Sequence, residues 1–468
     1  MKMKRFLAVA LAGIMVLGCC ACGQTKDQQS NNSDKNGGQT TTGDYVYTPK
    51  EVTITTWDYQ VSSTAASKWY QLRQEKFQEL YPEITLKIES VPAQSASGSV
   101  SADRVALTTG MAAGTAPTVY HAGHFSVMQQ WIEAGYAYPL DEYLGSFQDY
   151  DKIDPLAMEQ ATYNGSVYGI PRMVYVLNLA YRKDAYQEAG LDPNKPPTTW
   201  DELVEYSKKL TKADGSQYGL GLISATVADW WFQIFAWGAD AELSTVDESG
   251  KVSINFTDKK VVEALQFYHD LKWKHKVLQS DTGASQTSLI QDFAAGRCAQ
   301  TIFTTENYAY AKQCGLSDED LGLATIPVGP SGNEITANGG GYYFINASAT
   351  KEERDAAWEY IQFMTSEEAQ KELYEYLGNN GVITPYVSFY KTINVSDYID
   401  YEENLGVALQ NAWNNSRRES VLVEKLRPYL NPVIEEVMVN RSADLEALLK
   451  KAEKNANADV ISIYNSGK

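Results

Sequence analysis

The chain has 468 residues, of which 44% are hydrophobic and 21% charged, with 33 Gly and 15 Pro. This composition is typical of globular proteins and excludes a largely disordered or fibrous chain. Lys and Arg total 40 against 59 Asp and Glu, which gives a formal net charge of −19. A nucleic-acid partner is therefore not expected, because phosphate binding leaves a basic footprint. The 31 Tyr and 10 Trp suit wet recognition surfaces as well as half-buried packing.

The amino terminus predicts export. Lys2, Lys4 and Arg5 precede an apolar run from Phe6 to Gly18, which is too short to span a bilayer, since a span needs about 20 residues. This order of charged, apolar and small residues is that of a secretory signal. The sequence Val-Leu-Gly-Cys that ends at Cys19 resembles the bacterial lipobox, in which the cysteine is lipidated and becomes the first mature residue. Cleavage before Cys22 and an ordinary secretory signal without a lipid remain open alternatives.

The segment after the signal predicts a tether. Residues 23–44 contain no aliphatic or aromatic side chain, so they cannot bury a core. We therefore expect a signal peptide over 1–18, a lipidated flexible tether over 19–44 and a body held on the extracellular face of the bacterial cell membrane. A disulfide between Cys298 and Cys314 stays open, because sequence does not test its geometry.

The body begins with a β–α–β pattern. Apolar and polar residues alternate over 52–57, which predicts a half-buried strand. A helix with Trp69, Leu72, Phe77 and Leu80 on one stripe should follow and stop at Pro82. Alternation over 84–88 then predicts a second strand. Strand and helix signals continue to exchange places, so we predict an α/β fold with a parallel sheet and crossover helices.

Three later helices are expected to begin at capping boxes, in which a hydroxyl and a carboxylate satisfy the free amides of the first turn. The boxes begin at Thr199, Thr350 and Thr365, each followed by Glu three residues later. Their role is structural.

Short motifs follow one another in a fixed order along the body. In chain order they are Trp57 at the end of the first strand, Ala113–Tyr120, Gly135–Asp141, Tyr163–Pro171, Ala180–Asp184, Ala189–Leu191, Pro196–Leu203, Phe293–Arg297, Asn338–Ile345 and the region from Ala356 to Pro385. This ordered set resembles the family 1 extracellular solute-binding proteins of bacterial ABC importers, including the maltose- and oligosaccharide-binding proteins. Thr118 departs from the pattern, where the family usually carries Asp.

The resemblance implies a periplasmic-binding-protein-like fold, with two α/β lobes joined by a three-segment hinge and the ligand in the cleft between them. It places the crossing segments near Pro171–Tyr175, Gly340–Phe344 and Val382–Tyr386. The expected lobes are 45–171 plus 344–381 and 172–343 plus 382–468. Gly339, Gly340 and Gly341 suit a hinge, because glycine absorbs large dihedral changes at little cost.

A sugar site needs aromatic platforms for the apolar faces of the rings, and donors and acceptors for the hydroxyl groups. Trp57, Asp58 and Tyr59 supply these groups where the first strand ends, and crevices in open α/β sheets form at such ends. The other candidate ligand-binding residues are His121, Tyr175, Trp230, Trp237, Glu306, Asn307, Tyr342 and Tyr343. Core packing is the competing interpretation for the aromatic residues.

Neighbouring rings cannot all face one ligand. Trp230 and Trp231 point in different directions on a helix or a strand, so at most one should stack on a sugar. The same argument applies to Tyr342 and Tyr343. At 306–308, Glu-Asn-Tyr replaces the family's Gly-x-Trp platform, which favours hydrogen bonding over stacking.

His121 and His124 have a spacing that could suit a metal, but no Cys or third His lies near them in sequence. We therefore expect no metal and no cofactor.

The sequence predicts a binding protein and no enzyme. His-Glu-x-x-His, Gly-x-Ser-x-Gly and Gly-x-x-x-x-Gly-Lys are all missing, which disfavours a metalloprotease, an esterase and a nucleotide hydrolase. The expected partners are an oligosaccharide, the permease subunits of an ABC importer and, through the lipid, the membrane; we expect a monomer. A lipid-anchored glycoside hydrolase and a binder of a non-sugar solute remain alternatives, since 59 acidic residues would form carboxylate pairs by chance.

Overall fold

The structure is a computed structural model that describes residues 45–59, 65–91, 101–123, 125–382 and 386–467. These residues belong to one compact unit, Gly43–Lys468. The predicted signal peptide, the tether, Cys19 and His124 lie outside the described residues.

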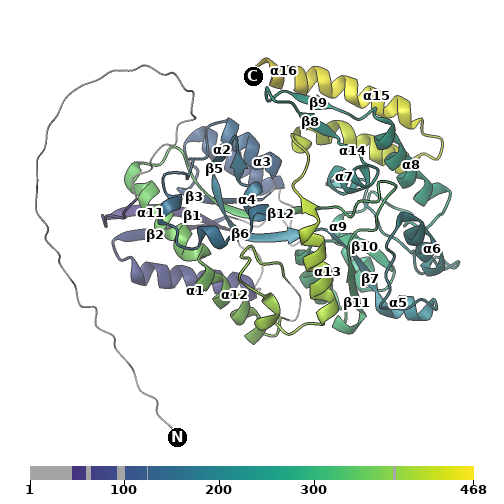
Figure 1. Ribbon diagram of the computed structural model, residues 1–468, viewed down its shortest axis with the longest axis horizontal. Helices are drawn as coiled ribbons and strands as arrows, with labels where there is room; N and C mark the ends of the chain where they lie inside the picture. The colour runs from purple at the N-terminus through teal and green to yellow at the C-terminus, as the bar shows by residue number, and fades with distance from the viewer. Residues whose placement is uncertain (1–44, 60–64, 92–100, 124, 383–385, 468) are drawn as a thin grey trace, which may run out of the picture. The chain divides into compact units, whose positions relative to one another are not determined.

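The body alternates short strands with helices throughout (Figure 1). The strands are β1 (Val52–Tyr59), β2 (Ile84–Val91), β3 (Val119–Gly123), β4 (Thr162–Tyr163), β5 (Ser166–Val167), β6 (Gly169–Val176), β7 (Asn178–Arg182), β8 (Ser244–Val246), β9 (Val252–Ile254), β10 (Gln300–Phe303), β11 (Leu321–Ala324), β12 (Thr336–Ile345) and β13 (Ser416–Arg417). The helices are α1 (Ala65–Leu80), α2 (Ser101–Ala113), α3 (Phe125–Glu133), α4 (Pro155–Glu159), α5 (Lys183–Glu188), α6 (Trp200–Leu210), α7 (Ala228–Gly238), α8 (Lys259–Trp273), α9 (Gln286–Ala294), α10 (Thr305–Gln313), α11 (Lys351–Thr365), α12 (Glu367–Asn379), α13 (Glu403–Asn414), α14 (Val423–Val439), α15 (Leu445–Ala456) and α16 (Ser462–Ser466).

The larger sheet confirms the predicted β–α–β beginning. Strands β1 and β2 are parallel, with Val52 opposite Ile84, and α1 connects them. The strand order is β13-β12-β3-β1-β2, and β6 also pairs with β12. Strand β3 runs parallel to β1, whereas β12 is antiparallel to β3 and to β6. The carboxyl ends of β1 and β3 therefore lie at the same edge of the sheet.

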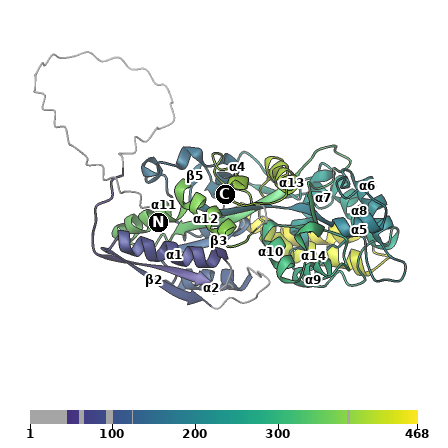
Figure 2. The ribbon, with the colours of Figure 1, turned by 90° about the horizontal axis from the view of Figure 1, so that it is seen from below.

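A second, smaller sheet has the order β10-β7-β11, with both outer strands antiparallel to β7. Helices α7, α8 and α14 pack against one another beside it (Figure 2). Helix α7 is buried on every side, because its sequence from Ala228 to Gly238 is almost wholly apolar and aromatic.

One of the three predicted capping boxes forms as predicted, and in each of the other two one capping contact is made by a neighbouring residue. Thr350 and Glu353 form the predicted reciprocal box at the start of α11. Thr199 accepts a hydrogen bond from the amide of Glu202, but the Glu202 carboxylate accepts from the amide of Thr198. At the third site the prediction was wrong by one position: Thr365 ends α11, and Ser366 caps α12.

Three groups of buried side chains form the core. The first surrounds the smaller sheet and α7. The second and third lie on opposite faces of the larger sheet, because successive residues of a strand point to opposite sides. Tyr343 and Ile345 of β12 face the second core, with α1, α11 and α12, while Tyr342 and Phe344 face the third, with α2 and α3.

Two of the three predicted crossing segments are paired strands that reach from one core to another. In β6, Val174 packs in the second core and Tyr175 in the first, and β12 carries Ala337 in the first core and Tyr343 in the second. The third passage differs from the predicted one near Val382–Tyr386. Val382 and Tyr386 both pack against the second core, and Ile399 is still part of it. In α13, Leu405 packs in the first core while Leu409 and Trp413 pack in the second, so the chain first reaches the first core within α13. The division into two lobes stays a prediction.

The glycines of β12 serve close approach in this structure. A Cβ on Gly340 would lie 2.4 Å from the carbonyl oxygen of Met173, and one on Gly339 would lie 2.6 Å from the ring of Tyr175. Both contacts are with the paired strand β6, so a larger residue would force the two strands apart. Their use as a hinge remains a prediction.

Cys298 is buried and Cys314 half-buried, and both are free thiols. No helix in the described part of the chain combines the length and the apolarity needed to cross a membrane.

Candidate ligand-binding site

The predicted ligand residues fall mainly at the carboxyl ends of β1 and β3 and along the crossing strands β6 and β12. Trp57 is half-buried against the third core, and its indole N–H donates to Glu89 Oε2 at 3.1 Å. Glu89 lies opposite Trp57 on β2, so the parallel pairing positions the two side chains. The backbones of Asp58 and Tyr59 continue β1, but their side chains lie outside the described residues.

Tyr175 and Trp230 are brought together from distant parts of the sequence. Their ring centroids lie 6.3 Å apart in an edge-to-face arrangement, which is favourable for two aromatic rings. Tyr175 is 7% exposed and Trp230 5% exposed, so little of either residue is open to solvent. The absence of a side chain on Gly339 makes room for the Tyr175 ring. These two residues remain candidates for the ligand site.

The other tryptophans of α7 serve packing. Trp231 is fully buried. Trp237 is 3% exposed; its indole N–H donates to Glu242 Oε2 at 3.2 Å, and the Arg417 guanidinium lies 4.0 Å from its ring centroid. A ring closed in by an acid on its edge and a cation on its face has no face left for a sugar in this structure.

Tyr342 and Tyr343 point to opposite faces, as alternation predicts, but each enters a core. The Tyr342 hydroxyl donates to the carbonyl of Ala157 at 2.7 Å. Tyr343 is 3% exposed and makes an edge-to-face contact with Tyr360 at 6.0 Å. The expectation that one of them is turned to a ligand has no support in this arrangement.

His121 is the middle residue of β3 and lies on the second-core face, with its ring centroid 6.3 Å from that of Tyr343. Burial, and secondarily the charge of Arg172, lowers its pKa well below the usual value, so the imidazole is neutral at physiological pH. Among the side chains that the structure describes, no group of His, Cys, Asp or Glu could hold a metal ion.

Asn307 has a structural task. Its side-chain oxygen accepts from the amide of Thr304 at 2.9 Å and from Gln286 Nε2 at 3.3 Å, and with Thr304 it forms the capping box of α10. The side chain of Glu306 lies outside the described residues. The sequence of the box, Thr followed three residues later by Asn, was the signal for this role.

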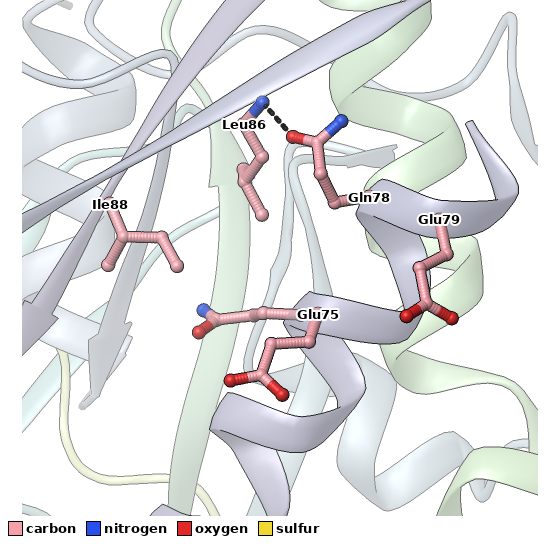
Figure 3. Close-up of a pocket in the computed structure, with 6 residues that line it drawn as sticks. Glu75, Gln78, Glu79, Leu86 and Ile88 are labelled. Carbon is pink, nitrogen blue, oxygen red and sulfur yellow. Dashed lines mark hydrogen bonds between the residues drawn. The ribbon is translucent and has the colours of Figure 1, made fainter. Parts of the chain in front are cut away.

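A surface pocket lies elsewhere, between α1 and β2 (Figure 3). Gln78 holds the two elements together, since its side-chain oxygen accepts from the amide of Leu86 at 2.7 Å and its amide nitrogen donates to the carbonyl of Ile84 at 2.6 Å. The pocket is lined by Gln74, Glu75, Gln78, Glu79, Leu86 and Ile88. It contains none of the predicted ligand residues.

Comparison with known proteins decides the family. The family model described as bacterial extracellular solute-binding protein matches residues 61–371. The chain belongs to this family. It is 24% identical over 362 residues to the maltotriose-binding protein of Pyrococcus abyssi, covering 75% of this chain and 72% of that one. It is 25% identical over 344 residues to the sn-glycerol-3-phosphate-binding periplasmic protein of Brucella melitensis, covering 70% and 73% respectively.

Solved structures agree with the predicted fold. An ABC-transporter solute-binding protein from Thermotoga lettingae, bound with α-D-tagatose, superposes with a TM-score of 0.72 at 20% identity, covering 87% of this chain and 99% of that one. The periplasmic-binding-protein-like α/β fold is thereby confirmed.

Sequence reasoning missed Arg172 in this solute-binding protein. It is the one charged residue of the otherwise apolar strand β6, Gly-Ile-Pro-Arg-Met-Val-Tyr-Val, and it lies beside His121. A charge inside an apolar crossing strand was the signal that could have found it.

Proposed function

We propose that this solute-binding protein captures an oligosaccharide outside the cell and delivers it to the permease of an ABC importer, without catalysing a reaction. Membership of the family carries the proposal, and the maltotriose-binding relative and the sugar-bound neighbour of the same fold favour a carbohydrate. The glycerol-phosphate-binding relatives keep a smaller polyol ester as the second candidate.

The candidate rings support this class of ligand. Trp57 stands at the carboxyl edge of the parallel strands and is the least buried of the candidate tryptophans. A half-exposed indole can cover the apolar face of a pyranose, while its N–H is held by Glu89. Tyr175 and Trp230 would contribute edges from the other side of the crossing strands.

Calorimetric titration against α- and β-linked glucans, mannans, xylans and galactosides tests the proposal. We expect one class to bind, and Trp57→Ala to weaken that binding by about 1–3 kcal/mol, the value of a buried aromatic anchor. Trp273→Ala is the matched control, because Trp273 is also half-buried but donates to the carbonyl of Val437, away from the parallel strand ends. If no carbohydrate binds, the sugar proposal falls; if products form, the protein is a hydrolase.

The lipid anchor forms a separate part of the proposal. Cys19→Ser should release the protein into the medium, whereas Cys22→Ser should leave it in the membrane fraction. Incorporation of labelled palmitate measures the lipid directly. The opposite pattern would move the lipidated residue to Cys22, and no effect of either change would remove the anchor.

A further inference from the structure

Arg172 is an unusual cation for its position. It is half-buried in β6, and its guanidinium lies 3.8 Å from the ring centroid of Tyr70 on α1 and 5.9 Å from that of Tyr343 on β12. In the part of the chain that the structure describes, its buried Nε has no hydrogen-bond partner. The groups that most strongly favour its charged form are Tyr70, Tyr343 and Tyr360, and Tyr343 also shares a side-chain hydrogen bond with it.

Other half-buried or buried arginines are paired. Their partners are Glu372 for Arg73, Asp184 and Asp320 for Arg182, Glu242 for Arg417, Glu159 for Arg418, Asp229 and Glu424 for Arg427, and the carbonyl of Ala349 for Arg354. Five of these arginines pair with an acid, as expected in a chain that carries 59 acidic residues against 40 basic ones. Arg172 differs from those five and resembles Arg354, which also stacks on a tyrosine; its position in the apolar crossing strand β6 is the feature to be explained.

The described neighbours bring no negative charge of their own. Burial raises the pKa of the Tyr343 phenol well above its usual value, so this hydroxyl is neutral. His121 is neutral as well, and the nearby charge of Arg172 is one reason. A charge that leaves water without a counter-charge is costly, so the arrangement is stable only if a group from outside compensates it or if the head keeps access to solvent.

Arg172 lies near the edge of the larger sheet at which a solute is expected to bind. His121, whose pKa responds to the charge of Arg172, is the middle residue of β3, two residues before the carboxyl end of that strand, and ligand crevices in open α/β sheets form at the carboxyl ends of the strands. Helix α1, which supplies Tyr70, has no acid in its first turn, so its positive amino-terminal end is not neutralised from within the helix. Stacking on Tyr70 also fixes the plane of the guanidinium, which prepares its paired N–H groups for a planar or tetrahedral anion.

We propose that Arg172 binds a negatively charged group on the solute, a carboxylate or a phosphate, so that the captured molecule is an acidic saccharide or a phosphorylated polyol. The inference rests on the proposed function, because it assigns the charge of the solute that this protein takes up. It narrows the substrate class to hydroxylated solutes with one anionic group.

The test compares matched neutral and charged ligands by calorimetry on the purified body. The pairs are galactose and galacturonate, maltose and maltose 1-phosphate, and glycerol and sn-glycerol 3-phosphate. Wild-type protein should bind one charged member at least about tenfold more tightly than its neutral partner, the usual size of a charge-assisted hydrogen bond. R172Q should remove that preference, and R172K, which keeps the charge but loses the paired N–H groups, should retain part of it.

R354Q is the matched control. Arg354 is also half-buried and stacks on a tyrosine, with its guanidinium 4.2 Å from the Tyr138 ring centroid, but it already donates to the carbonyl of Ala349. Its replacement should leave the charge preference unchanged. Thermal unfolding of every variant shows whether it is folded, and R172K keeps the test valid if R172Q is not.

Each outcome separates the two proposals. A charged preference that R172Q abolishes supports the inference. Equal binding of neutral and charged sugars, unchanged in R172Q, overturns the inference and leaves the carbohydrate function standing. Binding of sn-glycerol 3-phosphate alone keeps the role of Arg172 and overturns the oligosaccharide. Binding of no member overturns the inference, and silence across the wider carbohydrate panel as well overturns both.

Discussion

Arg417 and Arg172 each place a guanidinium over an aromatic ring, at 4.0 Å from Trp237 and 3.8 Å from Tyr70 respectively. Beside Arg417 stands Glu242, which pairs with the guanidinium and also accepts the indole N–H of Trp237. The groups that most strongly favour the charge of Arg172 are tyrosines, which are neutral, and Arg172 forms no ion pair with a described carboxylate. The same stacking geometry therefore occurs in two settings. Arg417, Trp237 and Glu242 form a closed triad that includes an acid, and Arg172 and Tyr70 form an open pair without one.

This difference suggests different roles: the Arg417 triad stabilises the fold, and the Arg172 pair is suited to bind a ligand. In the triad of Arg417, Glu242 and Trp237 the acid compensates the cation and accepts the indole N–H, so the charges balance within the group, which holds α7 to the segment around β13. Arg172 has no described acid paired with it, so its charge remains available to an anion. Aromatic rings alone did not distinguish the two cases, because Trp237 was as attractive a sugar platform in the sequence as any other ring. The charge balance around the ring makes the distinction.

The largest expected effect comes from the closed triad. Trp237→Ala should lower the free energy of unfolding by about 3–5 kcal/mol, because it removes a buried indole and leaves a cavity next to a stranded acid and base. Tyr70→Ala should cost less, since Tyr70 is half-buried. Urea unfolding measures both. A loss below that of Tyr70→Ala would show that the triad is not a structural element.

The ion pair between Asp229 of α7 and Arg427 of α14 allows a pH test of a buried charge that does have a partner. Burial raises the pKa of Asp229 to about 6, although Arg427 Nε lies 2.8 Å from its Oδ1 and favours the ionised form. The unfolded chain loses this proton near pH 4, so between about pH 4 and 6 the folded state binds more protons and stability falls as the pH rises. The contribution is complete below pH 4 and lost above pH 6.

Asp229→Asn should remove this dependence. We expect the free energy of unfolding of the wild type, measured against that of the variant, to fall by about 2–3 kcal/mol from pH 4 to pH 7. Glu419 and Glu359, whose pKa values burial raises to about 7, add the same trend to both proteins and cancel in the difference. A difference that is constant with pH would mean that Asp229 stays ionised throughout.

Replacing Arg417 should lower the free energy of unfolding, whereas replacing Arg172 should leave it unchanged or raise it. Arg417→Met leaves Glu242 without its partner and should cost about 0.5–1 kcal/mol, a modest value because both side chains are partly exposed. Arg172→Met removes a cation that has no described acid and should leave stability unchanged or raise it by up to about 1 kcal/mol. Thermal unfolding at one ionic strength compares them directly. A loss in Arg172→Met as large as in Arg417→Met would place Arg172 among the structural ion pairs.

The fold was legible in the sequence where local rules decide it. The strands predicted over 52–57 and 84–88, the helix between them and the capping box at Thr350 all occur, because period and caps act within a few residues. The predicted apolar stripe of that helix is only half right, since Trp69 and Phe77 are buried whereas Leu72 and Leu80 are exposed. The third passage was predicted near Val382–Tyr386 but lies in α13, since which core a segment joins depends on contacts far away in the chain.

The candidate site was less legible for the same reason. Trp57, Tyr175 and Trp230 remain candidates, but Trp237, Tyr342 and Tyr343 are enclosed by partners that sequence spacing does not reveal. Arg172 was overlooked because the search followed aromatic rings and loops. A single charge in an apolar strand carries more information than another tyrosine in a chain with 31 of them.

The smallest expected effect concerns Asn307, which is both a helix-capping residue and a candidate ligand-binding residue. Asn307→Ala should lower the free energy of unfolding by about 0.5 kcal/mol, because it opens the capping box at the start of α10. Its oxygen is already shared between Thr304 and Gln286, which leaves little capacity for a ligand hydroxyl. Affinity for the solute should therefore stay unchanged while stability falls. Glu353→Ala, in the equivalent box of α11, provides the stability reference. If Asn307→Ala weakened binding while Glu353→Ala did not, Asn307 would return to the ligand site and the amino-terminal end of α10 would join the recognition surface.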